Sequence, residues 1–87
     1  MITKTTILKN EDGLHARPAS ILSTTANKFK CDITMYLGDK KINAKSILNV
    51  MSAGIKGNSE VVIECNGEDE QIAMQEILAK FENKFGE

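Results

Sequence analysis

Apolar and polar residues alternate along several short stretches of the chain, and this pattern predicts β-strands. The clearest is residues 32–37, where apolar side chains occupy every second position, and residues 60–65 repeat it. Residues 2–8 are rich in the β-branched types that strands favour. Gly38-Asp39 is typical of a two-residue hairpin, so residues 40–43 are expected to pair back as a strand. Core-facing strand positions are expected at Ile33, Met35, Leu37, Val61, Ile63 and Cys65.

Apolar residues at helical spacing predict two longer helices and one short one. The first begins at Ala16, and Pro18 lies in its first turn, where no intrahelical N–H bond is lost. The short apolar segment 47–51 follows Ser46, a residue type preferred as an N-cap. The last helix is expected over residues 70–85. The buried stripes are expected to contain Ala19, Leu22, Ala26 and Phe29 in the first helix, and Met74, Ile77, Leu78, Phe81 and Phe85 in the last.

The resulting element order, β-α-β-β-α-β-α, favours an α+β fold. The 87 residues suffice for one domain over residues 1–87, with a small core. Four short strands cannot be covered on both faces in so short a chain. We therefore expect an open-faced β-sandwich, in which a four-stranded antiparallel sheet carries three helices on one face. Polar positions such as Thr34, Tyr36 and Glu64 are expected on the uncovered face.

Charge and composition narrow the classes of function. The chain has 11 basic and 12 acidic residues and no Trp, so it offers neither the positive surface nor the stacking platforms of a nucleic-acid binder. No apolar run approaches the roughly 18 residues of a membrane span, and the first residues lack a signal-peptide pattern, so we expect a cytoplasmic protein without membrane contact. One histidine and two isolated cysteines, Cys31 and Cys65, argue against a metal site, and both cysteines are expected in the core.

The only histidine, His15, lies at the predicted start of the first helix. A helix N-terminus presents free N–H groups and a partial positive charge, so the backbone amides of Ala16 and Arg17 could hold a phosphoryl group on the imidazole. The Arg17 guanidinium could bind the same oxygens, and Gly13 permits an unusual backbone angle before the histidine. These residues indicate an anion site at His15. They leave phosphoryl transfer, simple anion binding and a plain capping role open.

Ser46 has two interpretations. Capping of the short helix is a sufficient reason for a serine at this position. The alternative is a regulatory phosphorylation site, because the helix dipole tolerates a phosphoserine at an N-terminus. Ile47, Leu48 and Met51 cannot all face the core from so short a helix, so some of them are expected to form an apolar docking patch.

Two segments of the chain together resemble the HPr family, the histidine-containing phosphocarriers of the bacterial sugar phosphotransferase system. They are Gly13-Leu14-His15-Ala16-Arg17-Pro18-Ala19 and residues 44–55, AKSILNVMSAGI. The likeness extends over nearly the whole chain, including its length and element order. It implies the open-faced sandwich, and a Gram-positive-like carrier protein rather than an enzyme, with no cofactor and no metal.

The resemblance also implies roles for individual residues. His15 would accept a phosphoryl group at Nδ1 from enzyme I and pass it to the IIA domains of sugar-specific enzymes II, assisted by Arg17. Ser46 matches the site that an ATP-dependent HPr kinase/phosphorylase modifies in Gram-positive relatives. There the modified form serves carbon catabolite repression with a catabolite control transcription regulator. Ile47, Leu48 and Met51 match docking positions, and a monomer is expected.

The chain departs from the family pattern in two places. Gly57-Asn58 stands where many relatives have Lys-Gly, so a partner contact through a lysine at position 57 does not carry over. Asn58 can adopt the left-handed conformation that this turn requires. Asp12 places a carboxylate close to His15, where relatives often carry Ser or Asn.

Two other classes of function compete with the carrier role. A purely regulatory module would act through Ser46 alone, as some relatives do, but His15, Arg17 and Pro18 are all present here. A small nucleic-acid binder is disfavoured by the balanced charge. The carrier role is therefore the leading hypothesis.

Overall fold

The computed structural model describes all of residues 1–87. Every element predicted from the sequence is present, and most boundaries agree to within one residue. In chain order the elements are β1 (Ile2–Ile7), α1 (Ala16–Ala26), β2 (Asp32–Leu37), β3 (Lys40–Asn43), α2 (Ile47–Ser52), β4 (Glu60–Asn66), α3 (Glu70–Glu82) and the 3-10 turn η1 (Lys84–Gly86).

The four strands form one sheet in the order β1-β4-β2-β3, with every neighbouring pair antiparallel. In this register Met35 of β2 lies opposite both Ile63 of β4 and Ile42 of β3. All three side chains are fully buried, so the alternating apolar positions of the strands meet on one face. On the other face Thr34 lies opposite Glu64.

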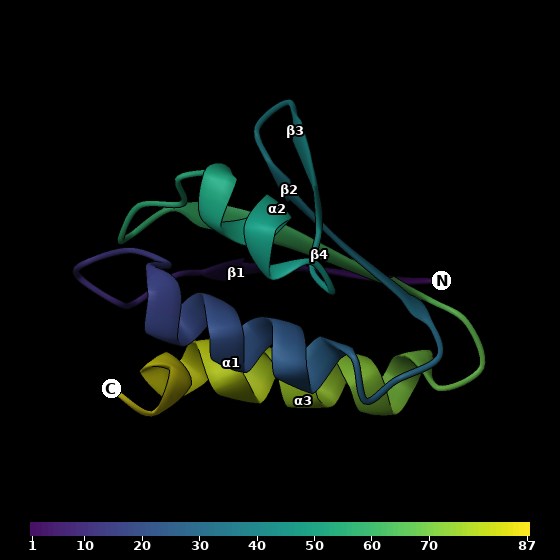
Figure 1. Cartoon of the computed structure of the whole chain (residues 1–87). Helices are drawn as coiled ribbons and strands as arrows, with labels where there is room; N and C mark the ends of the chain where they lie inside the picture. The colour runs from purple at the N-terminus through teal and green to yellow at the C-terminus, as the bar shows by residue number, and fades with distance from the viewer.

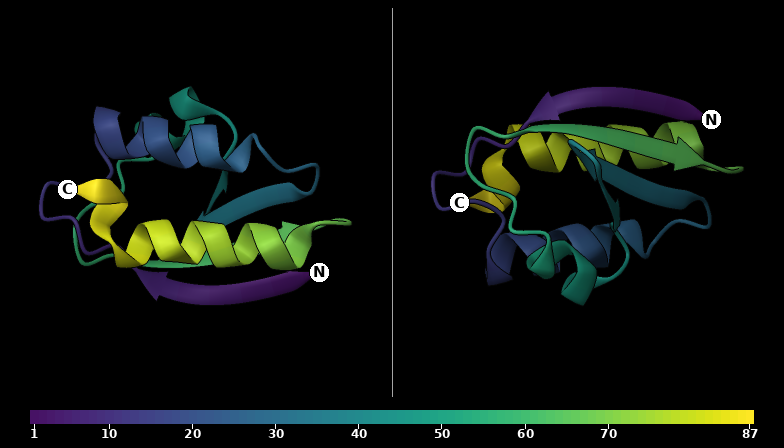
Figure 2. Two further views of the ribbon diagram at one scale, coloured as in Figure 1. Left: turned by 90° about the horizontal axis from the view of Figure 1, so that it is seen from below. Right: turned by 90° about the horizontal axis from the view of Figure 1, so that it is seen from above.

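The helices cover the apolar face of the sheet. Figure 1 shows α1 and α3 antiparallel beneath the strands, and Figure 2 shows the two helices side by side, with α2 next to α1. The open-faced β-sandwich with three helices is thus confirmed. Because α1 and α3 run in opposite directions, the end of α3 lies beside the start of α1 (Figure 1).

The core contains most of the apolar residues that the periodicity predicts. Phe81, Leu22 and Ile77 from the helices are completely buried. Phe29 and Leu78 are only half-buried, although the helical spacing predicts full burial. Phe29 departs from the expectation because α1 ends at Ala26, so this side chain projects from a loop rather than from the helical stripe.

The last helix is shorter than predicted. It ends at Glu82 rather than Phe85, because Lys84 and Phe85 adopt left-handed backbone angles, with φ of 58° and 53°. This turn places the Phe85 ring in the core, 5.0 Å from the Phe81 ring in an edge-to-face arrangement. The turn also directs the following residues back toward the start of α1 (Figure 1).

Both cysteines are buried free thiols, as predicted. Burial is the main cause that raises the pKa of the Cys31 thiol to about 12, with a smaller contribution from Asp69. Burial likewise raises the pKa of the Cys65 thiol. Both side chains therefore act as small apolar core residues.

Asp69, the residue before α3, connects this helix to the segment that leads into β2. Its carboxylate accepts hydrogen bonds from the backbone N–H groups of Lys30 and Cys31, at 2.8 and 2.9 Å. The bond from Lys30 is the main cause that lowers the pKa of the Asp69 carboxyl below its ordinary value of 3.8. The ionised carboxylate therefore stabilises the fold.

Replacing Asp69 by asparagine should destabilise the protein at neutral pH and have a smaller effect in acid. The folded-state pKa is lower than the unfolded value of 3.8, so the stabilisation is complete above that pH and lost as the pH falls through the folded-state pKa. Urea unfolding of both proteins at pH 7 and at successively lower pH should show the difference shrinking. A pH-independent difference would contradict a role for the carboxylate charge.

Candidate functional site

His15 is the N-cap residue of α1, with extended backbone angles. Its carbonyl accepts the first helical hydrogen bond, from the N–H of Ala19 at 2.9 Å. Its side chain makes no capping hydrogen bond and is exposed. Capping therefore does not account for the imidazole at this position.

The first turn of α1 leaves two backbone amides next to the imidazole. Helix geometry leaves the first N–H groups without intrahelical acceptors, and Pro18 has no N–H at all. Ala16 and Arg17 are the first two residues of α1, so their amides have no helical acceptor. No cluster of three His, Cys, Asp or Glu side chains is arranged to hold a metal ion.

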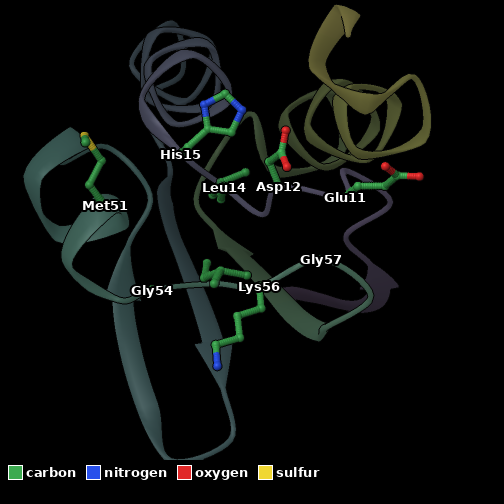
Figure 3. A pocket seen from close by; sticks show the side chains of 9 residues that line it. Glu11, Asp12, Leu14, His15, Met51, Gly54, Lys56 and Gly57 are labelled. Atoms are coloured by element: carbon green, nitrogen blue, oxygen red, sulfur yellow. The ribbon is translucent and has the colours of Figure 1, made fainter.

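A shallow hollow lies beside the histidine, between the loop before α1 and the segment that follows Met51. Figure 3 shows the His15 ring at its rim, with Met51 to one side and the Asp12 carboxylate to the other. The Lys56 amine points away from the ring (Figure 3). The hollow is lined by Glu11, Asp12, Leu14, His15, Met51, Gly54, Ile55, Lys56 and Gly57.

The two loops around this hollow are in direct backbone contact. The N–H of Leu14 donates to the carbonyl of Ile55 at 2.9 Å, and Gly13 has a φ of 75°. A Cβ at Gly57 would lie 2.5 Å from the Asn10 carbonyl oxygen. The backbone packing therefore leaves no room for a side chain at position 57, where the chain departs from the Lys-Gly pattern. Asn58 is left-handed as expected, with a φ of 66°.

Ser46 caps α2. Its Oγ accepts a hydrogen bond from the N–H of Asn49 at 3.1 Å, which confirms the predicted N-cap. The Asn49 side chain in turn accepts from the N–H of Asn43 at 2.7 Å. The half-buried Ser46 hydroxyl thus belongs to a small hydrogen-bond network at the start of α2.

Replacing Ser46 by alanine should lower the free energy of unfolding by about 1 kcal/mol, because the N–H of Asn49 loses its acceptor. Replacement by aspartate should retain most of the stability, since its carboxylate can accept the same bond. Urea unfolding curves measure both effects. Alanine at the exposed Ser20 of α1 is the matched control, and an equal loss there would contradict a specific cap.

Hydrogen bonds also fix α2 relative to α1. The buried Ser23 hydroxyl donates to the carbonyl of Ala44 at 3.1 Å, and the Asn27 amide donates to the carbonyl of Lys45 at 2.9 Å. The Lys45 amine donates to the carbonyl of Phe29 at 2.7 Å. The helix that begins at His15 and the one capped by Ser46 are therefore held in a defined arrangement.

The short helix α2 exposes an apolar patch formed by Ile47, Leu48 and Met51. Their exposed fractions are 43%, 75% and 43%, and Val50 is the only buried residue of α2. The expectation that this helix cannot bury all its apolar residues is thus confirmed. Met51 also lines the hollow beside His15, so the patch is continuous with the site.

The Arg17 guanidinium lies near an acidic side chain, that of Glu87. The Arg17 side chain is 77% exposed, and its guanidinium lies 3.9 Å from a carboxylate oxygen of Glu87. The other carboxylate oxygen of Glu87 lies 3.4 Å from Nε2 of His15. Asn10 also reaches this carboxylate, through its side-chain amide at 3.3 Å.

No pattern in the sequence places Glu87 or Asn10 beside His15. No motif includes Glu87, and its approach to His15 depends on the left-handed turn at Lys84 and Phe85. The turn contains one glycine, Gly86, with a φ of 80°, but Lys84 and Phe85 themselves carry no local signal for left-handed backbone angles.

The histidine region and the fold both agree with a known family. The family model described as "PTS HPr component phosphorylation site" matches residues 2–83. Phosphocarrier protein HPr of Mycoplasma capricolum is 45% identical over 71 residues, which are 82% of this chain and 80% of the relative. The HPr of Mycoplasma pneumoniae is 43% identical over 77 residues, 87% of this chain and 88% of the relative.

Solved structures agree with the sequence comparison. A crystal structure of HPr from Thermoanaerobacter tengcongensis superposes with a TM-score of 0.96 at 41% identity, covering 100% of this chain and 98% of that one. Dimers occur among the related structures, including an HPr dimer from the same organism. The chain therefore belongs to the HPr family, the phosphocarrier proteins of the phosphotransferase system, in which the protein carries the phosphoryl group rather than acting as an enzyme.

Proposed function

We propose that this protein accepts a phosphoryl group on Nδ1 of His15 from enzyme I and passes it to enzyme IIA domains during sugar uptake. The observation that supports this most is the imidazole itself, which is exposed at the start of α1 without a capping role. A helix N-terminus is a ready anion site, so the amides of Ala16 and Arg17 would bind the phosphoryl oxygens. Family membership supplies the chemistry that an anion site alone does not specify.

The transfer uses the lone pair of Nδ1. This nitrogen attacks the phosphorus, the bond from phosphorus to the donor breaks, and Nε2 keeps the ring proton. The exposed Arg17 side chain is free to turn from Glu87 toward the new phosphoryl group and bind it through two N–H donors. The patch formed by Ile47, Leu48 and Met51 lies where a partner that reaches His15 would contact the protein.

Incubation with enzyme I and phosphoenolpyruvate tests the proposal. We expect one acid-labile phosphate per chain by mass spectrometry, and transfer of that phosphate to a IIA domain. Absence of any adduct under conditions in which a known HPr is modified would contradict the proposed function.

A second, regulatory function is favoured by the position of Ser46. We propose that HPr kinase/phosphorylase phosphorylates this hydroxyl and that the product acts with a catabolite control transcription regulator in carbon catabolite repression. A phosphate at the start of α2 would meet the N–H of Asn49, which already donates to the Ser46 oxygen. Its charge would lie next to the apolar patch, so the main effect would fall on partner binding.

Phosphate mapping after reaction with the kinase and ATP tests this role. The phosphate should lie on Ser46, and phosphorylation of His15 by enzyme I should then become slower. Modification of Ser52 or Ser59 instead would overturn the assignment.

We also infer that the protein works as a single monomeric domain in the cytoplasm. Residues 1–87 would act as one domain and as a monomer in the cytoplasm, because a carrier must expose His15 alternately to two partners. Related structures include dimers, and light scattering would distinguish the two states. The balanced charge supports protein partners rather than nucleic acid or membrane surfaces.

A further inference from the structure

The Glu87 carboxylate lies between the two side chains of the proposed phosphoryl site. One of its oxygens is 3.4 Å from Nε2 of His15, and the other is 3.9 Å from the guanidinium of Arg17. The Glu87 side chain is only 26% exposed. An acidic group in this position faces one specific nitrogen of the ring.

The fold holds Glu87 in this position. The side-chain amide of Asn10, a buried residue, donates to the carbonyl of Lys84 at 2.8 Å and to the Glu87 carboxylate at 3.3 Å. The N–H of Glu87 donates to the carbonyl of Lys84 at 3.1 Å. The buried Phe85 ring anchors the same turn in the core. The contact with His15 therefore depends on several tertiary interactions.

The two ring nitrogens consequently have different surroundings. Figure 3 shows one nitrogen directed toward the side of Met51 and the other toward the side of the chain end, where Nε2 meets Glu87. A carboxylate next to Nε2 favours the proton on that nitrogen and leaves the lone pair on Nδ1. It also repels an anionic phosphoryl donor that approaches Nε2.

We propose that Glu87 is a positioning residue that directs phosphorylation of His15 to Nδ1. This inference rests on the proposed function, since it concerns which nitrogen of the same histidine reacts. After transfer the ring carries a phosphoryl group on Nδ1 and a proton on Nε2, and is therefore cationic. The Glu87 carboxylate stabilises that cation as well as the neutral ring that precedes it.

Phosphoramidate, a small chemical donor, isolates this effect from any partner protein. The Nδ1 lone pair attacks its phosphorus, the P–N bond of the donor breaks, and ammonia leaves with the bonding electrons. Phosphorus and nitrogen NMR of the product distinguish a phosphoryl group on Nδ1 from one on Nε2. In the unaltered protein we expect modification almost entirely on Nδ1.

The variant Glu87→Ala should increase the share of phosphate on Nε2 about two- to fivefold, in keeping with the strength of a partly exposed charge contact. Glu87→Gln keeps a similar side-chain volume and an oxygen that can accept a hydrogen bond from the Nε2–H group, so it should give a smaller increase. Glu82→Gln is the matched control, because it removes the same charge from an exposed residue of α3 that pairs with Lys9 instead.

The outcomes separate this inference from the proposed function. Phosphohistidine with the same Nδ1 to Nε2 ratio in the unaltered protein and in both Glu87 variants would overturn the positioning role and leave the carrier function intact. An equal increase in Glu82→Gln would attribute the effect to net charge and would also overturn it. Failure of enzyme I to modify even the unaltered protein would count against the carrier function itself.

Discussion

Replacing His15 by alanine should abolish phosphoryl acceptance from enzyme I completely, because the chain contains no other histidine. The stability should change little, within about 0.5 kcal/mol, since the exposed ring makes no capping hydrogen bond. Its backbone would still accept the first helical bond, from Ala19. Mass spectrometry after incubation with phosphoenolpyruvate and enzyme I, together with urea unfolding, would measure the two effects.

The combination of the two measurements makes this test specific. A variant that loses the phosphate and also unfolds would show only that the site needs the fold. Ser20→Ala, an exposed substitution on the same helix, should retain full acceptance. An acid-labile phosphate on the His15→Ala protein would place the acceptor elsewhere and contradict the proposal.

Most of the fold follows from short-range patterns in the sequence. Alternation in residues 32–37 and 60–65 places Met35 and Ile63 on one face, and antiparallel pairing then brings them opposite one another. The start of α1 is predictable because Pro18 suits a first turn, and the start of α2 because Ser46 is a good N-cap. Each of these signals depends on residues that are close together in the chain.

The end of the chain is not predictable in this way. Phe85 has the correct spacing from Phe81 to continue a helix, yet the chain turns left-handed at Lys84 and Phe85. Burial of the Phe85 ring stabilises a backbone conformation that neither residue favours by itself. Such a tertiary effect overrides local spacing, and it places Glu87 beside His15.

In the candidate site too, the features set by neighbouring residues are predictable from the sequence, and those set by tertiary contacts are not. The sequence correctly predicts that His15 begins a helix and that Ser46 caps another. It does not predict that Ser23 and Asn27 bind the backbone before Ser46, since these hydrogen bonds join segments about twenty residues apart. The contacts of Asn10 are not predictable from the sequence either, because its buried side-chain amide donates to Lys84 and Glu87, more than seventy residues away in the chain.

Replacing Gly13 by alanine should cause the largest loss of stability among the substitutions considered, about 2–5 kcal/mol. Two separate effects add at this position. The φ of 75° is left-handed, which costs a non-glycine residue about 1–2 kcal/mol. The new Cβ would also lie 2.5 Å from the carbonyl oxygen of Ile55, a backbone atom that cannot move aside as a side chain would.

Gly38→Ala is the matched control for this prediction. Gly38 has a similar φ of 59°, but a Cβ at this residue would have no atom within 4 Å, so only the left-handed cost of about 1–2 kcal/mol is expected. Urea unfolding of the two variants would therefore separate the conformational cost from the cost of the contact. Equal losses in both variants would show that the loops separate without strain and would contradict the close packing.

The same comparison has a functional consequence at His15. Relief of the clash at Gly13 requires the loop before α1 to move away from Ile55, and the N–H of Leu14 would then lose its 2.9 Å hydrogen bond. Because His15 follows Leu14 directly, the imidazole would shift relative to Met51 across the hollow. The Gly13 variant should therefore accept phosphate from enzyme I more slowly than the Gly38 variant, when both are assayed without denaturant at a temperature where both remain folded. Equal rates would show that the position of this loop does not control access to the histidine.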